Sequence, residues 1–93
     1  MHQLEQYYKG EENWLNFVDL YNEFWNENNN QIELLKALNN NLTIAKVIYG
    51  KMGNSSLKWI NEKIPALDNL SPIECTKNPE LIKRLKVCLK RMP

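Results

Sequence analysis

A stripe of large apolar side chains between residues 14 and 25 constrains this chain more than any other feature. The stripe recurs at the spacing of one helix face, and acidic and amide side chains occupy the opposite face. Its members are Trp14, Phe17, Val18, Tyr21, Phe24 and Trp25. This period predicts an amphipathic helix. A face so rich in rings must be covered, and we expect it to form core; a dimer or partner groove is the alternative.

Helix signals continue along the chain, and no segment sustains an alternation of period two. The asparagine runs at 28–30 and 39–41 are typical of caps and turns, so they separate helices. Apolar residues at helical spacing predict helices over 31–39, through Ile32, Leu35 and Leu38, and over 42–51, with Gly50 or Gly53 as the stop. We expect a helix or arm over residues 1–9, which Gly10 ends. The chain is predicted to be all-α, a small bundle of about five to six short helices.

The C-terminal half carries further helix-start signals. Asn54 or Ser55 is expected to cap a short helix that runs to Lys63 and ends before Pro65. Ser71 and Glu74 have the spacing of a capping box, with Pro72 at the first helical position. The cap and proline at 78–79 open the last helix in the same way. The sequence therefore places three helix starts within residues 54–79.

The last helix, expected over residues 79–92, is strongly two-sided. Its apolar face consists of Leu81, Ile82, Leu85, Cys88, Leu89 and Met92. The opposite face consists of Lys83, Arg84, Lys86, Val87, Lys90 and Arg91. A single apolar residue, Val87, in a field of cations is a candidate centre for a protein contact with a charged rim. The alternative is a solvated helix face.

Charge is distributed unevenly along the chain, although the net charge is only +1. Residues 1–50 hold three Lys and seven Asp or Glu, which gives −4. Residues 51–93 hold nine Lys or Arg and four Asp or Glu, which gives +5. A solvated basic face is the plainest explanation. The two others are an anionic partner and mutual attraction between the two halves.

The residues that catalysis or metal binding needs are scarce. His2 is the single histidine, and Cys75 and Cys88 form no CxxC pair, so we expect no metal site and no Ser, Cys or His catalytic centre. The chain has no glycine-rich phosphate loop. We therefore expect no enzyme and no cofactor. No apolar run reaches the ~18 residues of a membrane span, and a cytoplasmic location with reduced thiols is the default.

An ordered pattern runs through residues 44–93. It consists of Tyr49-Gly50, Trp59-Ile60, Ala66-Leu67, Ser71-Pro72-Ile73-Glu74 and Leu89-Lys90-Arg91-Met92. In order and spacing it resembles the toxin-binding domain of the MbcA/ParS/Xre antitoxin family. That family usually has glycine after the Ala-Leu step, where this chain has Asp68-Asn69, and often glycine where this chain has Pro79. Residues 1–43 do not resemble the DNA-binding domain common in the family.

The resemblance implies a function and an organisation. Residues 1–43 would be an N-terminal helical segment and residues 44–93 the antitoxin-like domain, with both forming one compact unit. The chain would sequester a RES-type toxin that acts on NAD, without a cofactor of its own, and would form a homodimer. Trp59 would anchor the core, and Leu67, Ser71, Pro72 and Glu74 would be architectural. Partner contacts would lie on the last helix, at the basic face given above.

Two other functions stay open. The helices on either side of residues 39–41 are compatible with a helix-turn-helix, and so with a small DNA-associated regulator. The second of them, however, offers only Lys46 and Lys51 as cations, whereas a recognition helix presents several Arg, Lys, Asn or Gln to base edges. Direct DNA binding is therefore not expected. A helical oligomerisation protein without a toxin partner is the remaining alternative.

Overall fold

Helices account for the regular structure that the computed structural model shows for residues 8–92. In this part of the chain there is no strand, and Ile64 and Leu70 form an isolated β-bridge. The elements are α1 (Glu11–Val18), η2 (Asp19–Phe24), α2 (Asn29–Ala37), α3 (Leu42–Met52), η3 (Gly53–Ser55), α4 (Ser56–Trp59), η4 (Pro65–Leu67), α5 (Pro72–Cys75) and α6 (Pro79–Arg91), where η denotes a 3₁₀ helix. The predicted all-α bundle is confirmed. The expected N-terminal helix or arm lies mostly outside the described residues.

Both asparagine runs mark helix boundaries, as predicted. The Asn28 side chain accepts a hydrogen bond from the Gln31 N–H at 2.9 Å, and the Gln31 side-chain oxygen accepts one from the Asn28 N–H, which makes a capping box. Asn39 and Asn40 have left-handed backbone, with φ of 57° and 61°. Asparagine tolerates this conformation better than most residues. Asn41 then caps α3 through the Ile44 N–H.

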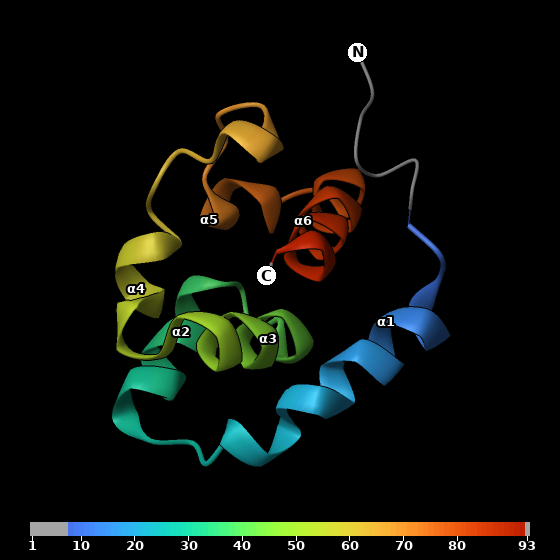
Figure 1. Ribbon diagram of the computed structural model, residues 1–93. Helices are drawn as coiled ribbons and strands as arrows, with labels where there is room; N and C mark the ends of the chain where they lie inside the picture. Colours follow the sequence, from blue (N-terminus) through green and yellow to red (C-terminus); the bar gives the residue numbers. More distant parts are fainter. Residues whose placement is uncertain (1–7, 93) are drawn as a thin grey trace.

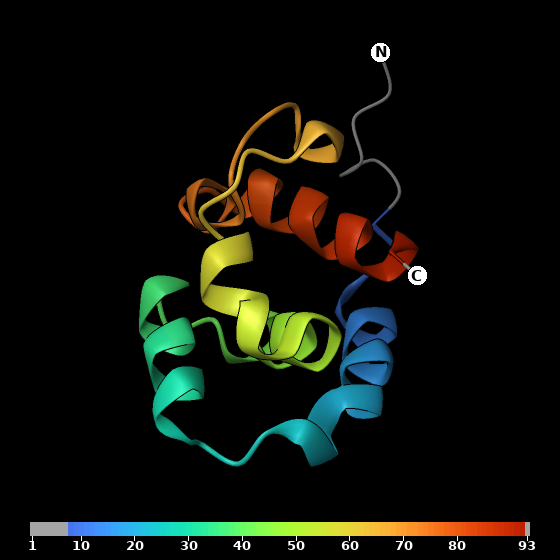
Figure 2. The same cartoon turned by 60° about the vertical axis from the view of Figure 1, so that its left-hand side comes forward.

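The α3 helix is the centre of the fold. In Figures 1 and 2 it lies between α2 on one side and α1 with η2 on the other, and α6 crosses it. Ile44, Ala45, Val47 and Ile48 have no exposed surface. The core cluster contains residues of both sequence halves, and the expected boundary after residue 43 falls inside α3.

The aromatic stripe is only partly core, and its prediction as one α-helix is wrong beyond Val18. From Asp19 the chain tightens into the 3₁₀ helix η2, in which successive residues turn by about 120° rather than about 100°. The stripe therefore leaves the core face in part: Tyr21 and Trp25 still pack at the edge of the core, but Phe24 does not. Trp14 and Val18 are buried, whereas Phe24 is 51% exposed.

Other details also differ from the sequence prediction. In α2 the core positions are Leu34 and Leu38, and Ile32 is 39% exposed. The short helix expected to reach Lys63 ends at Trp59, and the side chain of its N-cap residue makes no capping hydrogen bond. Pro65 begins η4 instead of following a helix. Trp59, expected to anchor the core, is half-buried and packs at the edge of the core.

The helix starts predicted at Ser71 and Asn78 are confirmed. Ser71 Oγ accepts from the Glu74 N–H at 3.2 Å, and Glu74 Oε2 accepts from the Ser71 N–H at 3.3 Å. Hydrogen bonds from Lys63 and from the Ser71 backbone hold the pKa of Glu74 below its ordinary value. The Asn78 side chain caps α6 through two backbone N–H groups. Leu67 and Pro72 are fully buried next to these caps.

Gly50 allows η2 to approach α3 closely. A Cβ atom at Gly50 would lie 2.1 Å from Cδ1 and 2.9 Å from Cγ of the Tyr21 ring. Gly50→Ala should therefore destabilise the fold by about 1–3 kcal/mol, because overpacking outweighs the ~1 kcal/mol that alanine gains in a helix. In a Tyr21→Ala background, Gly50→Ala should stabilise the fold. Chemical denaturation of the four variants measures both signs, and destabilisation in both backgrounds would contradict the proposed contact.

Ser71→Ala should reduce the free energy of unfolding by about 0.5–2 kcal/mol, because it removes the acceptor of the Glu74 N–H. Urea unfolding gives the change. Ser55→Ala is a matched control, because Ser55 occupies an N-cap position without a side-chain capping bond. An equal effect at both serines would show that the capping bond is not the cause.

Candidate functional site

The basic face of α6, where sequence reasoning placed the partner contacts, is largely used inside the molecule. Arg84 and Lys86 are each 8% exposed and Val87 is 5% exposed. The expectation that Val87 is the exposed centre of a contact is therefore wrong. Lys83 remains accessible and pairs with Glu80, one helical turn away, at 3.4 Å.

Lys86 joins α6 to the start of α1. Its ammonium lies 5.3 Å from the ring centroid of Tyr8 and 5.4 Å from that of Trp14. It donates a hydrogen bond to Glu11 Oε2 at 3.2 Å, and the Tyr8 hydroxyl donates to the same oxygen at 3.0 Å. Two ring faces and a carboxylate thus compensate the burial of this cation. Burial, together with the hydrogen bond to Glu11 and its charge, raises the pKa of Tyr8 to about 12.

Two further cations of α6 also reach other segments. Arg84 binds Asp68 after η4, with 3.0 Å between Nη1 and Oδ2. Lys90 donates to the Asn13 side chain on α1. The Lys86–Glu11 pair joins the basic half of the sequence to the acidic half. Mutual attraction between the two halves was one of the three explanations for the uneven charge. The Lys86–Glu11 pair shows that it accounts for part of the basic face.

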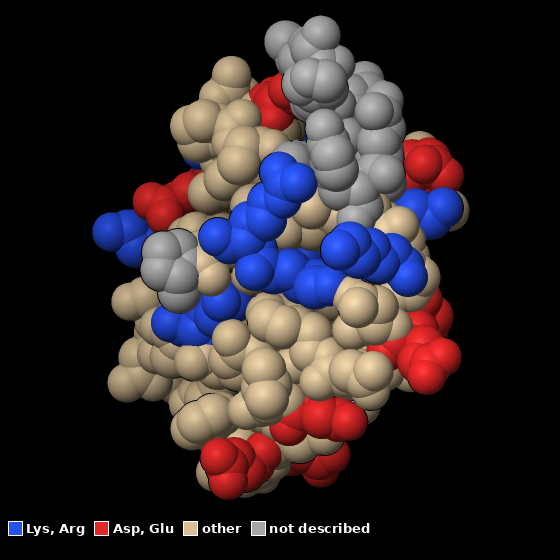
Figure 3. Space-filling model, turned by 45° about the vertical axis from the view of Figure 1, so that its right-hand side comes forward, with Lys and Arg blue, Asp and Glu red and all other residues tan. Residues whose placement is uncertain are grey.

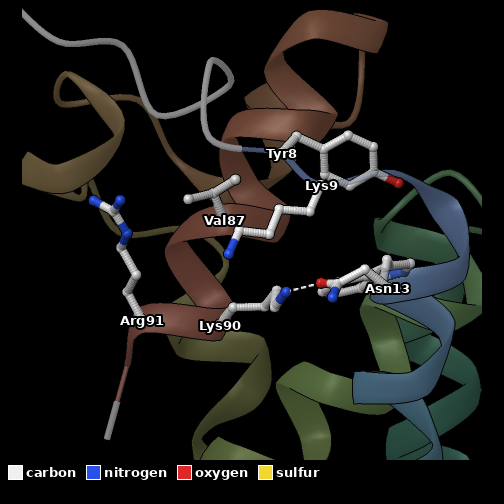
Figure 4. Close-up of a pocket in the computed structure, with 7 residues that line it drawn as sticks. Tyr8, Lys9, Asn13, Val87, Lys90 and Arg91 are labelled. Carbon is white, nitrogen blue, oxygen red and sulfur yellow. Dashed lines mark hydrogen bonds between the residues drawn. The ribbon is translucent and has the colours of Figure 1, made fainter.

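A cleft of about 350 Å³ lies between α6 and the chain around the start of α1. We call it the basic cleft; its lining residues are Tyr8, Lys9, Asn13, Trp14, Val87, Lys90 and Arg91. Figure 4 shows Val87 between Arg91 and the N-terminal residues, with the Lys9 side chain extending toward it. Figure 3 shows Lys and Arg side chains as a band across this face. The described lining residues include three cations and no acidic residue, so this part of the cleft favours an anionic group beside an apolar one.

The basic cleft contains half of the predicted contact residues. Val87, Lys90 and Arg91 lie in it, whereas Lys83, Arg84 and Lys86 do not line it. Sequence reasoning missed the side supplied by residues 8–14. Only the opposite charges of the two halves hinted that the start of α1 would lie against α6.

The cysteines and the possible metal ligands of the described residues form no reactive site. Cys75 and Cys88 are buried, and burial raises the pKa of the Cys88 thiol, so the thiolate is disfavoured at neutral pH. Within residues 8–92, no three Cys, His, Asp or Glu side chains gather as metal ligands do. In the same stretch, no helix has the length and apolar character of a membrane span.

Lys86→Met removes the ammonium and keeps much of the apolar chain. In the wild type, burial raises the pKa of Glu11, but hydrogen bonds from Tyr8 and Lys86 and the Lys86 charge outweigh it and hold the pKa below 4.5. Glu11 therefore stabilises the fold above pH 4.5, and this contribution is lost as the pH falls through the lower folded pKa. In Lys86→Met the pKa of Glu11 should rise, as a carboxyl NMR titration would show.

Lys83→Met is the matched control, because Lys83 pairs with Glu80 on the same helix. It should leave the Glu11 titration unchanged and should destabilise the fold less than Lys86→Met. Equal titration curves for the wild type and Lys86→Met would contradict the ion pair with Glu11.

No protein-family model, no curated protein and no solved structure matches this chain.

Proposed function

We propose that this chain is an antitoxin-like, non-catalytic protein-binding module that sequesters a RES-type toxin in the cytoplasm. The toxin would act on NAD, and the bound module would block the access of NAD to the toxin. Occlusion of this kind needs a stable surface and no cofactor.

The observation that carries the proposal is the backbone after Ala66-Leu67. Asp68 and Asn69 have φ of 57° and 63°, the left-handed region that favours glycine. The resembled family usually has glycine at this step. Aspartate and asparagine are among the few other residues that adopt this region readily. The departure in sequence is therefore compatible with the same turn.

Other elements of the resemblance also have structural uses that fit their residue types. Gly50 gives the space for the Tyr21 ring, and Ser71 with Glu74 forms the reciprocal cap. Leu67 and Leu89 are fully buried. These roles support the pattern as a set of fold-forming positions.

The toxin contact is placed on the accessible part of the basic face. Lys90 and Arg91 lie at the C-terminal end of α6 and line the basic cleft, and Lys83 is exposed further along the helix. Arg84, Lys86 and Val87 are left out of the direct contact set because they are buried. Their role would be to hold the surface in place.

A DNA-binding role has less support. In a helix-turn-helix, α3 would be the recognition helix, but four of its side chains are fully buried in the core. Lys46 donates to Asn22, and Lys51 donates to the Met92 carbonyl oxygen. This helix therefore has little to offer to base edges. Self-association, expected as a homodimer, remains part of the proposal. An oligomerisation role without a toxin is the alternative to it.

The proposal is tested by co-expression with the RES-type toxin of an adjacent reading frame. The wild-type chain should co-purify with the toxin and preserve the NAD content of the cell. Lys90→Glu/Arg91→Glu should weaken binding by roughly tenfold or more, mainly through slower association, because the charged rim steers the encounter. Binding at several salt concentrations measures the effect.

Lys36→Glu/Lys58→Glu is the matched control, because both lysines are exposed on α2 and α4, away from the cleft lining. It should keep full binding. A toxin that depletes NAD equally with and without the wild-type chain would overturn the function. Full binding by Lys90→Glu/Arg91→Glu would overturn only the contact surface.

A further inference from the structure

The η2 helix exposes large apolar side chains among acidic ones. Leu20 is 65% exposed and Phe24 is 51% exposed, and these are the two most exposed large apolar residues of the described chain. Asp19 and Glu23 on the same short helix are also exposed. We call these four residues the acidic knob. An aromatic and an aliphatic side chain left exposed on neighbouring turns of one short helix are a candidate interaction surface.

The basic cleft has the complementary chemistry. Val87 and Trp14 supply apolar lining, while Lys9, Lys90 and Arg91 supply positive charge. Figure 3 shows the basic band across the middle of this face and acidic side chains at its lower end. The net charge of +1 gives two copies little mutual repulsion.

The helix α1 holds the knob of one copy away from Tyr8 and Lys9 of the same copy's cleft. The cleft includes Tyr8 and Lys9, which precede α1, and the knob follows α1. The eight residues of α1 lie between Lys9 and the first knob residue, Asp19. At ~1.5 Å per α-helical residue, α1 is about 12 Å long. The same continuous segment thus carries the two features at opposite ends.

We propose that the basic cleft of one copy receives the acidic knob of a second copy. Leu20 or Phe24 enters the cleft, and Asp19 and Glu23 face the lysines and arginine of the rim. Because the two surfaces differ, the contact is heterologous, and each bound pair still presents one free knob and one free cleft. The association is therefore head-to-tail and continues beyond two copies as concentration rises.

This inference replaces the homodimer of the proposed function by a head-to-tail contact, and it does not depend on a toxin. Lys90 and Arg91 belong both to the cleft and to the proposed toxin contact, so a bound toxin would compete with the second copy. The experiments below use this chain alone. Their outcome is therefore separate from that of the toxin test.

Sedimentation of the wild-type chain at low salt should show an average mass that rises with concentration above the 11.0 kDa of one copy. Leu20→Ser/Phe24→Ser should raise the dissociation constant by at least about tenfold, the effect of losing one good apolar anchor. Ile32→Ser is the control, because Ile32 is an exposed apolar residue outside the knob. All of these positions are exposed, so thermal midpoints should stay close to the wild-type value.

A charge exchange tests the pairing directly. Glu23→Lys and Lys9→Glu should each weaken association by about tenfold, and added salt should reduce the difference from the wild type. A one-to-one mixture of these two variants should recover two-copy association, because the intact knob of one meets the intact cleft of the other. Glu33→Lys and Lys58→Glu, on α2 and α4, are the matched controls.

Three results would overturn the proposal. The first is a wild-type chain that keeps the mass of one copy up to millimolar concentration. The second is association that neither Leu20→Ser/Phe24→Ser nor Lys9→Glu weakens relative to its control. The third is association that stops at two copies, which indicates a symmetric dimer instead of a head-to-tail contact.

Discussion

Packing around α3 is the constraint on which the rest of this fold depends. The helix contacts α1, η2, α2, α4 and α6, so most of its surface belongs to the core. The side chains of Ile44, Ala45, Val47 and Ile48 on α3 are fully buried. Gly50 lets Tyr21 lie directly against the helix backbone. A chain of this length buries only about 60–65% of its unfolded surface, so a single central helix is an economical way to share one core.

Lysine side chains complete this packing at the aromatic segment. Lys51 lies 5.6 Å from the ring centroids of both Phe17 and Tyr21 and donates to the Met92 carbonyl oxygen. Lys86, on α6, lies in the same way over the rings of Tyr8 and Trp14. In both cases the aliphatic part of the lysine covers apolar surface and the ammonium meets ring faces. The aromatic residues that a small core cannot enclose are thus partly covered by cations.

The basic residues of α6 have two uses, which overlap at Lys90. Arg84, Lys86 and Lys90 bind neighbouring segments, and Lys90 and Arg91 line the basic cleft. The division matters for function because an interface needs both a rigid support and accessible charge. The same cleft is the surface on which both the proposed toxin contact and the proposed contact between copies depend, so the two are mutually exclusive.

The sequence by itself determined the features that depend on a few neighbouring residues. The all-α class, the capping box at Ser71 and Glu74, the cap at Asn78 and the asparagine boundaries all follow from local backbone chemistry. Gln31, a fully buried polar residue that binds the backbone of Phe24 and Asn26, was not foreseen, because its partners are set by how the connecting turn folds back. Only the tertiary structure decided which charges are exposed. Lys86 and Val87 have the pattern of a solvated face, but α1 packs there, and no local rule reports the approach of a segment about 75 residues away.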